Sequence, residues 1–115
     1  DDGNFDRARR YFRQALAIAQ ETMTRHGEGV VLNNIGLVEM HQGENDLALK
    51  NLRRSLSIAQ ELGELAGEGT AWRNIANLYR KAGQQQEAEN AQAEAIEIAR
   101  QLGYTCNAGI RRWFE

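Results

Sequence analysis

The chain of 115 residues contains no proline, a single cysteine and no apolar run long enough to cross a bilayer. Because proline removes a backbone donor and breaks helix interiors, its absence favours nearly continuous helix. The lone Cys106 excludes an internal disulfide framework and a cysteine-cluster metal site, and it fits a reducing compartment, so we expect a cytoplasmic protein. The net charge of −2 argues against nonspecific binding to nucleic acid or to an anionic membrane.

Glycine, in contrast, is abundant and periodic. Gly3, Gly43 and Gly83 lie 40 residues apart, and so do Gly27 and Gly67. Superposing residues 3–42 on residues 43–82 gives fourteen identical pairs, and a third copy begins at residue 83. A repeat of this length indicates a stacked array of supersecondary units.

Within each unit the apolar residues recur at helical spacing. Trp72, Ile75, Ala76 and Tyr79 fall at i, i+3, i+4 and i+7, which places them on one face of a helix. Small residues at the start of the following helix would let two backbones approach closely. We take the paired glycines near 27–29 and 67–69 as punctuation between helices. The pattern predicts about six helices, over residues 5–23, 29–42, 45–62, 69–82, 85–102 and 106–115.

The sequence Trp72-x-x-Ile75-Ala76-x-x-Tyr79-x-x-x-Gly83-x-x-x-x-Ala88 resembles the tetratricopeptide repeat, and the preceding unit matches it at several positions. The chain departs from that pattern at Glu39, where an aromatic residue is usual, and at Gln92, where a large apolar residue is usual. The 40-residue period is similar to that of Partner of Inscuteable-type scaffolds and of many bacterial regulators. The resemblance implies an all-α fold, a right-handed superhelix (α-solenoid) of antiparallel helix pairs.

The repeat register predicts one array over residues 1–115. Residues 3–27 form the second helix of a truncated repeat, residues 28–67 and 68–107 form two repeats, and residues 108–115 start a further helix. Ile110, Trp113 and Phe114 give that last segment an apolar stripe. We therefore expect the array either to continue in a longer superhelix or to form a homo-oligomer through exposed repeat ends.

The inventory of reactive side chains is poor for catalysis, so we expect no enzyme, no cofactor and no metal site. His26 and His41 lie too far apart for metal-ligand spacing on a helix. Gly27-Glu28-Gly29 lacks both a preceding strand and the third glycine of a dinucleotide-binding loop.

What remains is a binding surface. In the family that the chain resembles, the first helix of each pair lines the concave side, and the resemblance assigns Val30 and Thr70 to it. The candidate peptide-binding residues on that side are Asn33, Asn34, Leu37, Met40, His41, Arg73, Asn74, Asn77, Arg80 and Lys81. The cations and amides suit an acidic segment, and Leu37 with Met40 would seat its apolar side chains. The function expected is a protein-binding scaffold. The alternative is a structural or self-associating spacer in a larger signalling or regulatory protein.

Overall fold

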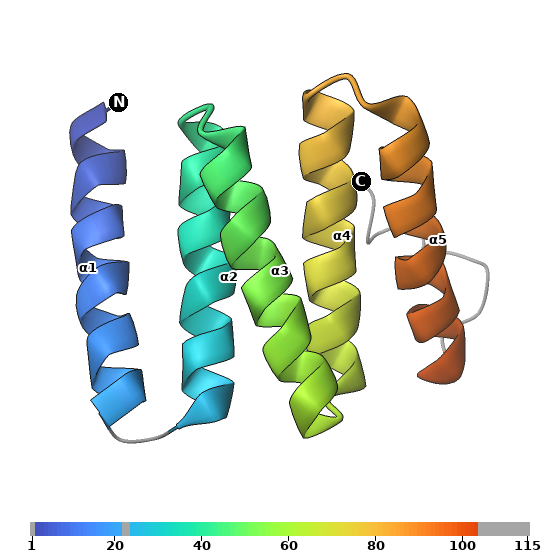
Figure 1. Ribbon diagram of the computed structural model, residues 1–115, viewed down its shortest axis with the longest axis horizontal. Helices are drawn as coiled ribbons and strands as arrows, with labels where there is room; N and C mark the ends of the chain where they lie inside the picture. Colours follow the sequence, from blue (N-terminus) through green and yellow to red (C-terminus); the bar gives the residue numbers. More distant parts are fainter. Residues whose placement is uncertain (1, 22–23, 104–115) are drawn as a thin grey trace.

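The computed structural model describes residues 2–21 and 24–103, and all regular structure in these ranges is α-helical. Five helices alternate in direction along the array (Figure 1): α1 (Asp2–Glu21), α2 (Arg25–His41), α3 (Asn45–Leu62), α4 (Leu65–Lys81) and α5 (Gln85–Gln101). α2 packs most extensively on α3 and α4 on α5, while α1 and α3 join these pairs by packing on α2 and α4. The expected all-α array is confirmed. The sixth expected helix, over 106–115, lies outside the described residues.

The first helix of each pair starts earlier than the sequence analysis predicts. α2 begins at Arg25 and α4 at Leu65, not near 29 and 69, so the glycines taken as punctuation lie inside these helices. A Cβ atom on Gly29 would lie 3.1 Å from Cγ2 of Ile58, and one on Gly67 would lie 3.3 Å from Cβ of Ala59. These glycines are therefore explained by close helix contacts and not by turns.

The turns between helices use a different set of glycines, spaced by 20 residues. Gly43, Gly63, Gly83 and Gly103 all have positive φ, between 68° and 90°. After α2, the amide of Gly43 donates to the carbonyl of Met40 and that of Glu44 donates to the carbonyl of Glu39. Left-handed glycine with such backbone hydrogen bonds is a common helix ending, because it satisfies the last carbonyls. The half-repeat is thus one helix and one tight turn.

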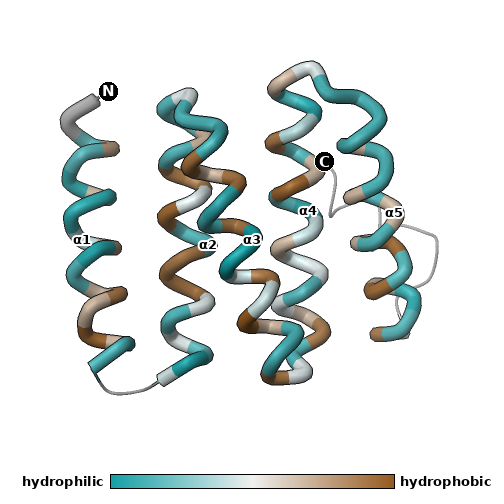
Figure 2. The backbone as a smooth tube through the Cα atoms, viewed as in Figure 1, coloured by the Kyte–Doolittle hydropathy of each residue, from teal (hydrophilic) through white to brown (hydrophobic). Residues whose placement is uncertain are grey.

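The core lies where the helices meet in the middle of the array. Leu32, Leu52, Ile75 and Leu78 are the largest fully buried side chains. The small residues Ala48 and Ala88 are 0% exposed, as expected for close helix approach. Figure 2 shows the hydrophobic segments gathered in α2, α3 and α4, with much of α1 and of the first half of α5 hydrophilic. The core is therefore built mainly by α2, α3 and α4.

Candidate functional site

A cleft of about 660 Å³ opens between the first halves of α2 and α4, and its floor is the second half of α3. Its lining is largely apolar. Val30 from α2 is 47% exposed and Leu102, just after α5, is 37% exposed. Ile58, Ala59, Leu65, Asn33 and Thr70 also line the cleft. This set is named the α2/α4 cleft.

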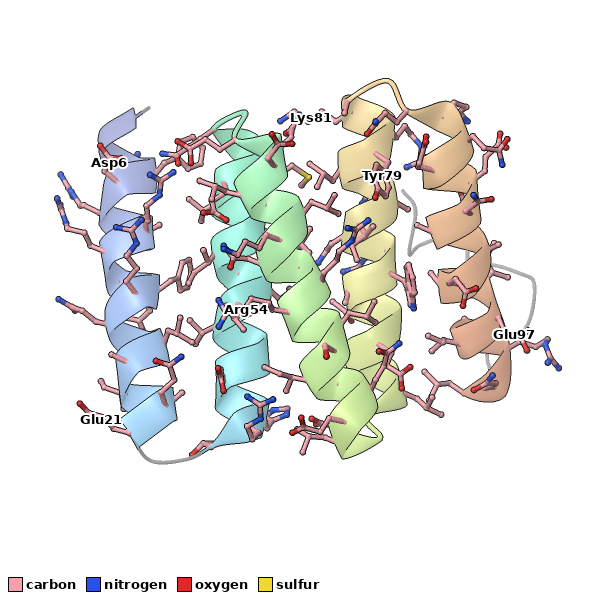
Figure 3. The ribbon with its side chains drawn as sticks, in the orientation of Figure 1. Asp6, Glu21, Arg54, Tyr79, Lys81 and Glu97 are labelled. Carbon is pink, nitrogen blue, oxygen red and sulfur yellow. The ribbon has the colours of Figure 1, made fainter. Side chains whose placement is uncertain are left out.

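The cleft opens at one end because α2 and α4 are joined farther along. The side chain of Asn74 donates through Nδ2 to Oδ1 of Asn33 at 2.9 Å. Beyond it, Nζ of Lys81 donates to the carbonyl oxygen of Met40 at 2.8 Å, and Figure 3 shows Lys81 reaching from the end of α4 towards the end of α2. A cation at the carboxyl end of a helix also opposes the helix dipole favourably.

At the mouth of the cleft, Nδ1 of His26 lies 2.6 Å from Oε2 of Glu64. Both side chains are at the surface, with His26 on the first turn of α2 and Glu64 immediately before α4. This contact connects the start of α2 to the α3–α4 turn. His26 is therefore part of the cleft entrance, although its sequence position suggested no role.

The structure brings part of the expected peptide-binding set together. Asn33 and Asn74 form the link described above, and Asn74 is only 5% exposed, so its amide is committed to the fold. Met40 is buried in the core, so the apolar seat expected from Leu37 and Met40 is reduced to the half-buried Leu37. His41 is exposed and stacks on Phe5 of α1 at a ring-centroid distance of 6.1 Å. Asn34 is half-buried on α2.

The three cations expected on this side all lie on α4, at increasing distance from the cleft. Arg73 is half-buried, while Arg80 and Lys81 are exposed. The guanidinium of Arg80 donates to Oδ1 of Asn77 and to Oε1 of Gln92, both at 2.8 Å. Arg80 and Lys81 therefore place their charges at the end of α4 opposite the cleft, where Lys81 already donates to the carbonyl of Met40.

Leu65 and Leu102 line the cleft although the sequence pattern does not predict either as a site residue. The predicted helix over 69–82 leaves Leu65 outside, because α4 begins four residues earlier, and Leu102 is only the last residue of the helix predicted over 85–102. The 40-residue register carried a usable signal: Leu65 is equivalent to Arg25, and Gly69 to the glycine that sits inside α2.

A second polar cluster lies at the junction of α1, α2 and α3. The Arg25 guanidinium donates to both oxygens of Glu61 at 3.0 Å and to Oε1 of Glu28 at 2.7 Å. The hydrogen bonds to Glu61 and then to Glu28 raise the pKa of Arg25, and the same bonds to Arg25 lower the pKa of Glu61. The buried Glu28 also accepts from Nε2 of Gln20 on α1 at 3.3 Å. These side chains are hydrogen-bonded to one another, so the cluster connects α1, α2 and α3.

Neither a metal centre nor a membrane span is found in the parts of the chain that the structure describes. Over 2–21 and 24–103, no three His, Cys, Asp or Glu side chains come together as a possible metal site. No helix in these ranges has the length and apolar character needed to span a membrane.

Comparison with known proteins agrees with the helix pairing. The tetratricopeptide repeat is matched by two family profiles, one over residues 27–101 and the other over residues 1–26. A search of curated proteins gives no match. Since the first profile alone spans more than half of the sequence, the chain belongs to the tetratricopeptide repeat family.

Proposed function

We propose that the chain binds a segment of a partner protein along the face formed by α2 and α4. Tetratricopeptide repeats in general mediate protein–protein interactions. The observation that carries the proposal is the α2/α4 cleft, which supplies an apolar hollow at one end of α4 while Arg80 and Lys81 lie at the other. We expect the segment to place an apolar side chain in the cleft and acidic side chains near Arg73, Arg80 and Lys81.

The size and lining of the cleft suit such an anchor. Its volume of about 660 Å³ falls within the usual range for ligand pockets, which is about 300–1,000 Å³. Burying a leucine-sized side chain contributes about 1.5–3 kcal/mol. Val30 and Leu102 are among the most exposed large apolar residues of the described chain, so an anchor between them would cover surface that is now in contact with water.

The cations of α4 determine which way the bound segment runs along the face formed by α2 and α4. An arginine guanidinium has five N–H donors, and within residues 2–21 and 24–103 Arg80 uses two of its nitrogens, on Asn77 and Gln92. It can still present a charged donor to a carboxylate, and arginine is well suited to that geometry. Because the cleft is at one end of α4 and Arg80 with Lys81 at the other, the apolar anchor and the acidic residues should be separated along the peptide.

The experiment compares charge reversal on this face with the same reversal elsewhere. The probes are two fluorescent nine-residue peptides with a leucine near one end, identical except that one carries two glutamates near the other end and the other carries two lysines there. We expect the glutamate peptide to bind the wild-type chain and the lysine peptide to bind at least tenfold more weakly. Arg73→Glu combined with Arg80→Glu should abolish the difference. Arg7→Glu combined with Arg10→Glu, on the exposed surface of α1, makes the same charge change and should leave it. Equal affinity of the two peptides for the wild type would refute the acidic preference.

The cleft is tested separately, through its apolar anchor. Val30→Asp places a charge at the wall without touching the cations on α4. We expect Val30→Asp to weaken the binding of a leucine-containing peptide about tenfold. The binding of an otherwise identical alanine-containing peptide should not change, because only the leucine side chain buries a large apolar surface in the cleft. Equal losses for both peptides would mean that the leucine does not enter the cleft.

One observation favours the alternative role of a self-associating spacer. On α1, Tyr11 is 66% exposed and Ile18 is 60% exposed. The residues at the position of Ile18 in the next two units, Ile58 and Ile98, are 5% and 6% exposed, so α1 displays a face that the other units cover. If this face joins two copies, light scattering should show a dimer that Ile18→Glu returns to a monomer. A monomer for the wild type at high concentration would exclude this role for α1. The expected association stripe of Ile110, Trp113 and Phe114 lies outside the described residues.

A further inference from the structure

A second hollow lies between α3 and α5, with α4 as its floor. It encloses about 420 Å³ and opens away from the α2/α4 cleft, because its walls are the second helices of the two pairs. Figure 3 shows Tyr79 of α4 in the opening between α3 and α5. The lining residues are Arg53, Leu56, Trp72, Ile75, Tyr79, Glu87, Asn90, Ala91 and Glu94. We call this surface the α3/α5 groove.

The floor of the groove is aromatic. Trp72 and Tyr79 stand at i and i+7 on α4, so they lie on the same helix face two turns apart. Both are half-buried against the core, and part of each ring system lines the groove. Nη2 of Arg53 on α3 donates to Oη of Tyr79 at 2.7 Å, which fixes the phenol against the α3 wall.

The α5 wall is acidic and its carboxylates are unused. Glu87, Asn90 and Glu94 occupy i, i+3 and i+7 and are all exposed. Among the described residues, neither Glu87 nor Glu94 has an ion-pair or hydrogen-bond partner. In contrast, Glu97 farther along α5 is paired with Arg100 at 2.6 Å. Two unpaired carboxylates therefore face the same hollow as the tryptophan.

The corresponding surface 40 residues earlier is chemically different, although the backbone repeats. The floor positions of Trp72 and Tyr79 are there Leu32 and Glu39, and both are buried. The wall position of Glu94 is there Arg54, which lies between α1 and α3 in Figure 3 with Nη2 3.9 Å from Oε2 of Glu28. Aromatic floor and acidic wall thus occur together at the α3/α5 groove and are not a consequence of the repeat.

We propose that the α3/α5 groove binds a lysine or arginine side chain of a partner protein. The aliphatic stem would lie on Trp72, and the cationic head would lie between Glu87 and Glu94. The indole face would pack against the apolar stem, and the two carboxylates would form charge-assisted hydrogen bonds with the head. Arg53 on the opposite wall repels the entering cation and so keeps its head on the α5 side of the groove. The groove and the α2/α4 cleft would then select opposite charges on opposite faces of one array.

The test uses the indole N–H resonance of Trp72 in a proton–nitrogen correlation spectrum, which Trp72→Leu identifies by removing it. The probe is acetyl-Gly-Arg-Gly-amide, and its neutral counterpart carries citrulline in place of arginine. We expect the arginine peptide to shift the resonance in a saturable way, with an affinity roughly three- to tenfold above that of the citrulline peptide. Glu87→Gln combined with Glu94→Gln should lower the affinity for the arginine peptide to that for the citrulline peptide.

The matched control is Glu89→Gln combined with Glu97→Gln, which makes the same charge change on the same helix outside the groove. It should keep the preference for arginine. Equal shifts by both peptides, or an equal loss in the control, would overturn the proposal. Glu94→Gln alone should give an intermediate loss, so the outcome can be read even if the double variant loses helix content by circular dichroism. The α2/α4 cleft is unchanged in all these variants, so a negative result leaves its acidic preference standing.

Discussion

The contact between Gly36 and Leu52 predicts that Gly36→Ala destabilises the wild-type chain but stabilises the Leu52→Ala variant. Gly36 is buried within α2, and Leu52 of α3 is 0% exposed. A Cβ atom on Gly36 would lie 2.8 Å from Cγ and 2.9 Å from Cδ2 of Leu52. No real Cβ is found so close to another carbon, so Gly36→Ala forces the leucine or the helix to move.

The magnitudes follow from two opposing effects. Replacing a helical glycine by alanine gains about 1 kcal/mol of helix propensity. Overpacking a tight core costs about 1–3 kcal/mol. We therefore expect Gly36→Ala to lower the free energy of unfolding by about 0–2 kcal/mol in the wild type. Leu52→Ala alone should lower it by about 2–5 kcal/mol, because a fully buried leucine is lost.

In the Leu52→Ala background the two clashing carbons are gone, and the nearest remaining group is the carbonyl oxygen of Ala48 at 3.3 Å. Gly36→Ala should there be stabilising by up to about 1 kcal/mol. The double variant is thus more stable than the sum of the single changes predicts, by about 1–3 kcal/mol. Urea unfolding followed by circular dichroism at 222 nm measures all four free energies. Additivity within about 0.5 kcal/mol would refute the close contact as the reason for glycine at this position.

Two further predictions concern the ties and turns of the array. The hydrogen bond to Arg25 lowers the pKa of Glu61 below its ordinary value of about 4.5. As the pH falls, the Glu61 carboxylate is therefore protonated in the unfolded chain before it is protonated in the folded chain. The stability that this pair contributes is therefore present above about pH 4.5 and lost below it, so the difference in Tm between wild type and Glu61→Gln should shrink from pH 7 to pH 3. A constant difference would mean that the charge of Glu61 is not involved. At Gly83, where φ is +79°, alanine should cost about 1–2 kcal/mol in urea unfolding although no atom lies within 4 Å of its Cβ. An unchanged unfolding midpoint would show that the turn adopts another conformation.

Much of the fold could be predicted from the sequence because it depends on periodicity. The apolar spacing around Trp72 and the small residues at Ala48 and Ala88 fix which helix faces meet, and the structure buries them as expected. The helix starts could not be predicted, because a glycine has the same appearance in a turn and at a close helix contact. Gly43 has a positive φ and open space where a Cβ would lie, whereas Gly29 is helical and packs against the side chain of Ile58. Only the position of the neighbouring helix separates the two cases.

The candidate sites were predictable to a smaller extent. The register placed Asn33 and Asn74 on neighbouring helices, and the structure joins them. The register could not show that the amide of Asn74 is the donor in this bond. It also could not show that Met40 is buried in the core, because both facts depend on how closely neighbouring helices pack. Lys81 is a similar case. From the sequence, a lysine at a helix end is expected to be an exposed cation, whereas in the structure Nζ of Lys81 donates to the carbonyl oxygen of Met40.

A repeat holds the backbone constant while each position is free to change its chemistry, and the structure shows this at one position. Glu39 and Tyr79 are 40 residues apart and occupy the same place in successive units. The carboxylate of Glu39 is 4% exposed and accepts a hydrogen bond from Nδ2 of Asn51 at 2.7 Å, so it joins α2 to α3. At the position of Asn51 the next unit has the small Ala91, which offers no donor and leaves room beside the Tyr79 ring. The loss of that donor and the gain of the aromatic residue convert a closed interhelical contact into the floor of the α3/α5 groove, although α2 and α4 are both 17 residues long.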